Sequence, residues 1–246
     1  MMSWQAWAPP VGWPTAAPPV RWQTLSLWGP HQATLWLFEL DAPSADTPSF
    51  TACLSDAEHT RAQRFRLPLH ARRHRVAWSM VRHLLSHLSL RSASDLDWRL
   101  GAHGKPALAV PSARLHFNLS HSAGFALLAT SATLEVGVDL EDTGSAAQMA
   151  DMAPRILSPS EQAHFARANT LTPEHLLSTW VRKEACLKAL GTGLNREMDC
   201  ITLGEGQVRG ATPNGSQGEE LGDIRWCDVA LPEYCHAQAA LAWLQN

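Results

Sequence analysis

The stretch Leu54-Ser55-Asp56-Ala57-Glu58 has a counterpart about a hundred residues later, Leu157-Ser158-Pro159-Ser160-Glu161. A serine with a glutamate three residues on forms a capping box, in which each side chain accepts a hydrogen bond from the backbone N–H of the other residue. Both stretches therefore predict the start of a helix. The proline in the second stretch falls in the first helical turn, where it is tolerated.

A second pair of matching stretches follows these helix starts. Trp78-x-x-Val81-Arg82-x-x-Leu85 corresponds to Trp180-x-x-Lys183-Glu184-x-x-Leu187, at nearly the same distance from its capping box. The repeat predicts two related α/β halves that meet near residues 112 to 136, with a ligand cleft between them. Coincidence between two ordinary capped helices is the alternative interpretation.

Other segments give the outline of each half. Ala33–Leu40 predicts a buried strand, and apolar residues at helical spacing predict a long helix from about Ala71 to Leu90. Pro9–Pro19 cannot form regular helix or central sheet, and Gly204–Gly222 has the composition of a loop or hairpin tip. We expect a Pro/Trp-rich extended arm at 1–30, an N-terminal α/β subdomain at 31–125 and a C-terminal α/β subdomain at 126–246.

Composition excludes several classes of protein. Hydrophobic residues at 45% and charged residues at 17% are typical of a globular chain. A net charge of -3 argues against nucleic acid or an anionic membrane as the main partner. Five scattered cysteines without a C-x-x-C pair indicate reduced thiols in a cytoplasmic protein, and the sequence shows neither a signal peptide nor a transmembrane segment.

Two carboxylates end a short apolar strand at Val136–Glu141. Because side chains alternate along a strand, Asp139 and Glu141 lie on the same face. Such a pair suits Mg²⁺, which takes carboxylate oxygens and also binds substrate phosphates. The alternative is a solvated strand edge.

A third carboxylate and a lysine lie on the predicted helix Trp180–Lys188. Glu184 and Lys188 are four residues apart and so share one helical face. The face could serve a metal and a phosphate together, or it could hold an ordinary surface ion pair. Gly191-Thr192-Gly193-Leu194 ends the helix with a glycine cap.

Two further motifs carry groups that could contact phosphate. Ser120 and His121 lie at a predicted strand end in Phe117–Ser122, and Lys105 lies in the loop motif Gly104-Lys105-Pro106. A satisfied turn histidine and a solvated lysine are the alternatives. An excess of arginine between Arg61 and Arg82 favours a small polyanion, although nucleic acid is a further alternative.

In this order the motifs closely resemble those of the surfactin-type 4′-phosphopantetheinyl transferase superfamily. Val136–Glu141 and Trp180–Lys188 match the paired signature, and Gly104–Pro106 and Phe117–Ser122 match two upstream motifs. The resemblance spans roughly Leu54 to Leu194. It implies a monomer of two pseudo-symmetric α/β subdomains, each a small, mostly antiparallel sheet packed with helices, with coenzyme A in the cleft.

The resemblance also implies the metal site and its neighbours. Asp139, Glu141 and Glu184 would hold Mg²⁺ on the pyrophosphate of coenzyme A, and Lys188 would lie by the same phosphates. Because a hydroxyl needs help to lose its proton at neutral pH, we also expect Glu184 to be the general base for the serine, directly or through a metal-bound water.

Further residues would face the nucleotide end of coenzyme A. These are Lys105, Ser120 and His121, with His121 near the 3′-phosphate. Arg73 falls where the family often has the arginine of Ala-His-Arg, and it is the first candidate for another 3′-phosphate contact, with Arg75 as the second. Glu161 aligns with a family glutamate near the site, although its capping box explains it equally.

The implied reaction moves the phosphopantetheine arm of coenzyme A onto a serine of an apo acyl or peptidyl carrier protein and releases 3′,5′-ADP. A Mg²⁺-dependent hydrolase of nucleotide pyrophosphates and a coenzyme A-binding module without turnover are the competing functions. The carrier contact is expected to be hydrophobic with a basic rim.

Overall fold

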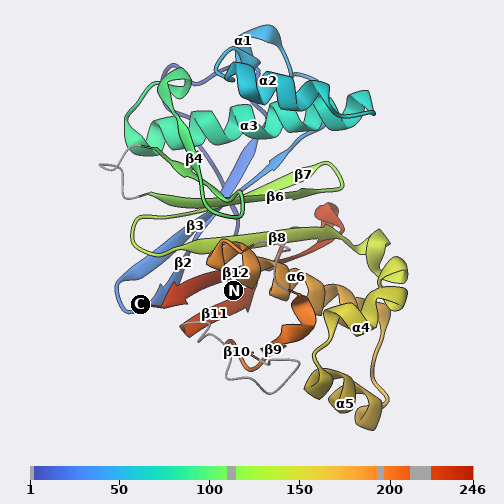
Figure 1. Cartoon of the computed structure of the whole chain (residues 1–246). Coiled ribbons are helices and arrows are strands. Elements are labelled where there is room, and N and C mark those ends of the chain that lie inside the picture. Colours follow the sequence, from blue (N-terminus) through green and yellow to red (C-terminus); the bar gives the residue numbers. More distant parts are fainter. Residues whose placement is uncertain (1–2, 110–114, 193–196, 211–222, 246) are drawn as a thin grey trace.

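The computed structural model describes residues 3–109, 115–192, 197–210 and 223–245, and its strands form two main antiparallel sheets (Figure 1). The first sheet is built from β1 Gln5–Ala6, β2 Val20–Trp28, β3 His31–Glu39, β6 His116–Ser122 and β7 Phe125–Ser131. The second is built from β8 Val136–Asp142, β11 Asp223–Asp228 and β12 Ala237–Gln245. Their strand orders, β1-β2-β3-β7-β6 and β11-β12-β8, place β6 and β8 at sheet edges.

The helices of the N-terminal half lie over one face of the first sheet, at the top of Figure 1. They are α1 Pro48–Thr51, α2 Asp56–Gln63 and α3 Pro68–Ser89. The middle of the apolar stripe of α3, from Val76 to Leu85, is buried and packs with Phe38 and Leu128 of the sheet. This long helix was predicted because its apolar residues recur every three to four positions.

The C-terminal half repeats this arrangement at the bottom of Figure 1. Its helices are α4 Ala153–Ile156, α5 Pro159–Ala168 and α6 Pro173–Leu190, and α6 packs on β8, β11 and β12. Two small hairpins complete the fold, β4 Trp98–Leu100 with β5 Pro106–Leu108, and β9 Ile201–Leu203 with β10 Val208–Gly210. The turn of the second hairpin and its strand β10 lie in the predicted loop segment, whose residues 211–222 lie outside the described part of the chain.

Both predicted capping boxes are present. Ser55 and Glu58 cap α2, and Ser158 and Glu161 cap α5. Each capping glutamate also binds a buried cation from the following long helix. The Glu58 Oε2 to Arg82 Nε distance is 2.8 Å, and the Glu161 Oε2 to Lys183 Nζ distance is 2.6 Å. The two halves thus share an internal ion pair as well as an order of elements, which confirms the mixed α/β fold with a repeated plan.

The two sheets pack against each other through one apolar layer. Leu35, Leu37 and Leu127 of the first sheet share a buried cluster with Val138 and Leu241 of the second. The first sheet includes β7, which begins at the expected boundary of 125/126, and also β2, within the segment expected as an arm. We propose that the division between the halves falls at residues 132–135, between β7 and β8.

The tryptophans near the N-terminus hold that segment against the body. The Trp7 ring lies 4.5 Å from the Trp13 ring and 5.8 Å from the Trp36 ring, measured between centroids. Trp4 Nε1 donates to Ala230 O at 2.7 Å. The N-terminal segment therefore contacts both halves. Within the described part of the chain, no helix combines the length and apolar character needed to cross a bilayer.

Candidate active site

The strand β8 carries Asp139 and Glu141 to the junction of the two halves. Asp139 is 2% exposed and Glu141 is half-buried. Gly137 lets α6 lie directly on this strand, because a Cβ atom there would collide with Ala185 O and Ala189 N. The glycine of this motif therefore brings the backbone of α6 close to the two carboxylates.

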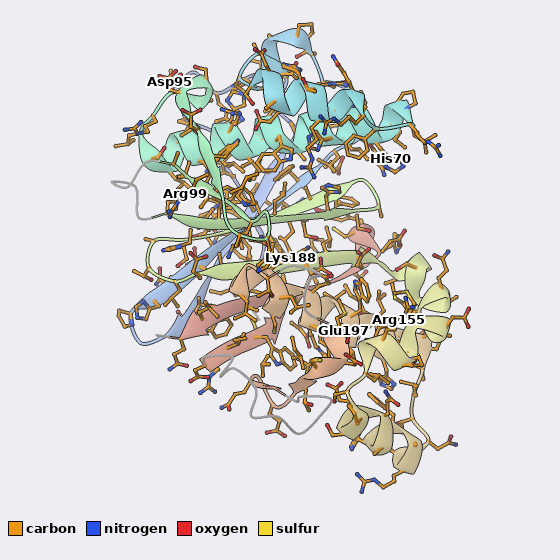
Figure 2. The ribbon with its side chains drawn as sticks, viewed as in Figure 1. His70, Asp95, Arg99, Arg155, Lys188 and Glu197 are labelled. Atoms are coloured by element: carbon orange, nitrogen blue, oxygen red, sulfur yellow. The ribbon has the colours of Figure 1, made fainter. Side chains whose placement is uncertain are left out.

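The helix α6 supplies Glu184 and Lys188, one turn apart. Glu184 is buried, and Lys188 Nζ lies 2.6 Å from Asp139 Oδ1 and 3.1 Å from Ser120 Oγ. Figure 2 places Lys188 near the centre of the molecule, where the halves meet. The lysine thus pairs across elements with Asp139, so the alternative of a surface Glu184–Lys188 pair does not apply.

Burial and mutual repulsion raise the pKa of two of the carboxylates. The pKa of Glu184 rises to about 7, mainly because burial disfavours its charged form, and Asp139 and Glu141 add to the rise while Lys188 opposes it. The pKa of Glu141 is raised by burial first and by Asp139 second. Three acidic groups therefore share a site in which the positive charge of Lys188 does not offset their burial and mutual repulsion.

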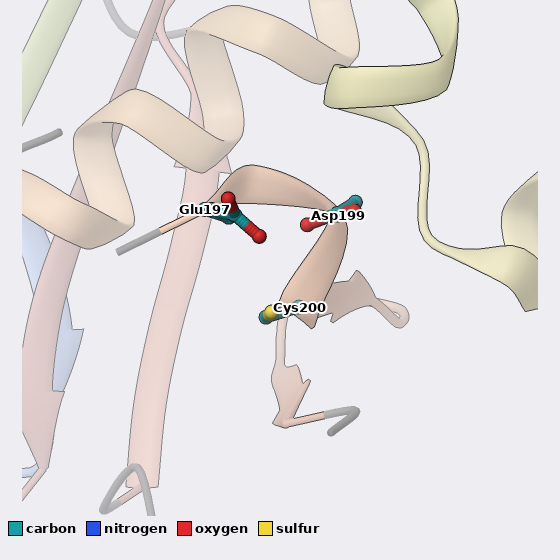
Figure 3. A group of neighbouring side chains, drawn as sticks. All are labelled: Glu197, Asp199 and Cys200. Carbon is teal, nitrogen blue, oxygen red and sulfur yellow. The ribbon is translucent and has the colours of Figure 1, made fainter. Parts of the chain in front are cut away.

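This donor set fits a divalent cation. All three side chains offer oxygen, which Mg²⁺ prefers, and Asp139 Oδ2 is buried without a hydrogen-bond partner. Oxygens of the three groups do not all lie within 4.8 Å of one another. Among the described residues, one group of three potential ligands has its ligand atoms within 4.8 Å of one another, and it consists of Glu197, Asp199 and Cys200 (Figure 3).

Ser120 and His121 of β6 lie beside the same groups. Ser120 Oγ donates to Asp139 Oδ1 at 2.9 Å. The pKa of His121 is lowered by desolvation first, and then by the positive charges of Lys188 and Arg73. The structure therefore brings the predicted Ser120 and Lys188 into contact with Asp139, whereas His121 is linked to the site through the charge of Lys188.

The two candidate arginines differ in their surroundings. Arg73 Nε lies 2.9 Å from Asp41 Oδ1, next to the β6–β7 turn, where a Cβ on Gly124 would come within 3.3 Å of Arg73 Nη2. Arg75 Nε lies 2.7 Å from Asp46 Oδ1. Both guanidinium groups already have a carboxylate partner, and the charge of Arg73 contributes to the lowered pKa of His121.

The ammonium group of Lys105 is bound by oxygens of the protein itself. Its ammonium donates to Glu135 Oε2 at 2.8 Å, Val136 O at 3.0 Å and Ala189 O at 3.1 Å, and burial lowers its pKa. It ties the β4–β5 hairpin to β8 and to the end of α6. A cavity of about 730 Å³ lies beside it, lined by the hairpin, the start of β6 and Ala189–Thr192.

Two residues that contact β8 at this site had no place in the predicted site. Asn118 and Ser122 lie on the same face of β6 as Ser120, and Ser122 Oγ donates to Glu141 Oε2 at 3.0 Å. The alternation of Asn118, Ser120 and Ser122 along the strand was the available signal.

The fold and these residues define a two-lobed α/β protein with an acidic site and a lysine at the junction of its lobes. The family model described as 4′-phosphopantetheinyl transferase superfamily matches residues 135–239, and the model described as 4′-phosphopantetheinyl transferase, N-terminal, matches residues 42–133. The chain belongs to the 4′-phosphopantetheinyl transferase superfamily, as its motifs predicted.

Named relatives agree with this assignment. The chain is 32% identical over 166 residues to 4′-phosphopantetheinyl transferase HetI of Nostoc sp., covering 65% of this chain and 69% of HetI. It is 26% identical over 156 residues to 4′-phosphopantetheinyl transferase Sfp of Bacillus subtilis, covering 63% of this chain and 67% of Sfp. It is 27% identical over 158 residues to the human L-aminoadipate-semialdehyde dehydrogenase-phosphopantetheinyl transferase, covering 57% of this chain and 51% of that protein.

Proposed function

We propose that this enzyme transfers the phosphopantetheine arm of coenzyme A to a serine of an apo carrier protein, with Mg²⁺ held by Asp139, Glu141 and Glu184. The observation that carries the proposal is the meeting of Lys188 and the three carboxylates at one junction of β8 and α6. When bound, Mg²⁺ would supply the positive charge that these carboxylates lack and that a pyrophosphate requires.

In the proposed reaction the serine Oγ forms a bond to the pantetheine-side phosphorus. The bond from that phosphorus to the bridging oxygen breaks, and 3′,5′-ADP leaves with the electron pair. Glu184 takes the serine proton, a role open to a carboxylate that lies beside the proposed metal site and is ionised there. Lys188 offsets negative charge on the phosphates.

The nucleotide end of coenzyme A is proposed to lie by Ser120, His121 and Arg73. His121 and Lys188 already share one electrostatic environment, which suits an anion. The cavity beside Lys105 is proposed to take another part of the ligand, although none of Ser120, His121, Lys188 and the three carboxylates lines it. For Lys105 itself we propose a supporting role, because its ammonium is bound by three protein oxygens.

The competing functions find less support. The relatives are transferases, which favours neither a hydrolase nor a binding module. The basic helix offers little to nucleic acid, because Arg82 is buried against Glu58, and Arg73 and Arg75 pair with aspartates. We also propose that the protein acts as a monomer, since one chain supplies both lobes, and that it is cytoplasmic, since Cys53, Cys186 and Cys235 are buried as thiols.

A docking surface for the carrier is proposed at the corner between α2 and α3. Phe65, Leu67 and Leu69 are 40%, 57% and 46% exposed there. Arginines 61, 64 and 66 surround them, and the chain has no acidic residue from 59 to 94. The corner is linked to the site through His70, whose charge lowers the pKa of His121; Figure 2 shows His70 at the end of the upper helix. An apolar patch with a basic rim fits an acidic carrier protein.

The test is to incubate the protein with coenzyme A, Mg²⁺ and a panel of apo carrier proteins, and to weigh the carriers. A mass gain equal to one phosphopantetheine on at least one carrier is expected. Release of 3′,5′-ADP at full rate without any carrier would contradict the proposal and favour the hydrolase.

A further inference from the structure

The edge strands β6 and β8 lie side by side in the same direction but belong to different sheets (Figure 1). Both strands are fully described, and no backbone ladder joins them. Side chains of β6 take the place of a ladder. Asn118 Oδ1 accepts from Val138 N at 2.9 Å, Ser120 Oγ from Leu140 N at 3.3 Å, and Ser122 Oγ from Asp142 N at 3.1 Å.

We name Asn118, Ser120 and Ser122 the polar seam. The three residues alternate along β6 and so share one face, and the amides that they bind alternate along β8 and so point to one edge. Each contact joins a residue to the one twenty positions later, which fixes the register of the two lobes. The seam satisfies backbone donors that would otherwise lie unpaired at the junction.

The two serines have a second role, because each hydroxyl can donate as well as accept. Ser120 Oγ donates to Asp139 Oδ1 at 2.9 Å, and Ser122 Oγ donates to Glu141 Oε2 at 3.0 Å. Both proposed metal ligands of β8 are thus oriented by hydroxyls from the other lobe. Lys188 also contacts Ser120, whereas the hydroxyl of Ser122 bonds to Glu141 and to the amide of Asp142.

We propose that Ser122 is a positioning residue that orients Glu141 toward the divalent cation, an inference that rests on the proposed function. Glu141 is half-buried, and several staggered rotamers are in principle available to a glutamate side chain. A hydroxyl anchored by the Asp142 amide selects one of them. Groups that hold a metal ligand in place typically affect metal affinity by roughly 10-fold to 100-fold.

The experiment measures Mn²⁺ binding to the full chain with coenzyme A present, by the loss of the free Mn²⁺ signal in electron paramagnetic resonance. We expect Ser122→Ala to weaken Mn²⁺ binding roughly 10-fold and Ser122→Thr, which keeps the hydroxyl, to bind nearly as wild type. The KM for coenzyme A at saturating metal should stay unchanged in both variants.

Ser131→Ala is the matched control. Ser131 is another strand serine, more buried than Ser122, whose hydroxyl accepts from backbone amides and donates to Gln32 O rather than to a carboxylate. Equal Mn²⁺ affinity in Ser122→Ala and wild type would overturn the inference, as would an equal loss in Ser131→Ala. If wild type itself bound no Mn²⁺, the metal role in the proposed function would fail instead.

Discussion

Lys188 Nζ lies 2.6 Å from Asp139 Oδ1, so a cation from α6 and an almost fully buried carboxylate from β8 form an ion pair where the lobes meet. The carboxylate has its second oxygen unpartnered, and Glu184 and Glu141 add more negative charge nearby. In the protein without metal, Lys188 is therefore the cation that makes this acidic site tolerable.

Replacing Lys188 should expose that dependence. We expect Lys188→Met to lower the free energy of unfolding by about 2–3 kcal/mol in EDTA, since it leaves Asp139 buried without its cation. Added Mg²⁺ should recover part of the loss, because it would neutralise the same oxygens. Urea unfolding with and without Mg²⁺ measures both, with Lys188→Arg as the charge-retaining control. If Mg²⁺ raised the unfolding free energy of Lys188→Met less than that of wild type, Lys188 and Mg²⁺ would not neutralise the same oxygens.

Glu184→Gln should remove turnover while leaving coenzyme A binding largely intact. The amide keeps the shape of the side chain but cannot take the proton of the attacking serine. Single-turnover mass spectrometry measures the transfer step, and calorimetric titration measures coenzyme A binding. Turnover like that of wild type in this variant would exclude Glu184 as the base.

The raised pKa of Glu184 also predicts how stability depends on pH. The folded protein holds this proton up to about pH 7, whereas the unfolded chain releases it near 4.5. The native state therefore binds more protons between these values, and its stability falls as pH rises through this window. Urea unfolding in EDTA at pH 5 and pH 8 should show a smaller fall in Glu184→Gln than in wild type. The same fall in both proteins would assign the effect to other groups.

Gly137→Ala should disturb the packing of α6 on β8. The new methyl group would meet Ala185 O and Ala189 N, which belong to helix backbone and cannot move independently. We expect a loss of about 3 kcal/mol in unfolding free energy and a larger loss of activity. Gly101→Ala is the control, because a Cβ there would lie an ordinary 3.5 Å from Lys105 O. Equal stability of the two variants would show that α6 can shift at little cost.

Leu67→Ser should raise the KM for the carrier protein about 10-fold and leave the KM for coenzyme A unchanged, if the corner between α2 and α3 is the docking surface. Leu171 lies in the corresponding connection between α5 and α6 and is 41% exposed, so Leu171→Ser is a matched control. Steady-state kinetics with each substrate varied in turn separate the two KM values. A rise confined to Leu171→Ser would move the docking surface to the other lobe.

Much of this architecture could be predicted from local signals. The capping boxes at Ser55 and Ser158 depend on residues three apart, and α3 depends on periodic apolar positions. Both features can therefore be predicted from short stretches of sequence. The grouping of Asp139 and Glu141 follows from strand alternation. The contact of Lys188 with Asp139 required only that α6 lie on β8.

The contacts that could not be predicted from the sequence involve partners far along the chain. Arg75 is held by Asp46 and Lys105 by Glu135, each about thirty positions away, and neither carboxylate belongs to a motif. The pairing of β7 with β3 also depends on tertiary contacts, because an apolar strand fits either sheet equally well by sequence. The polar seam needed the register of β6 against β8, which no local pattern encodes.

The shared apolar layer between the sheets has a consequence for the integrity of the chain. Each lobe, taken alone, would present to water the leucines and valines that now cover one another. If the chain is cleaved within 132–135, the two fragments should therefore stay associated. Either fragment expressed alone should aggregate, or bind the other fragment when it is added.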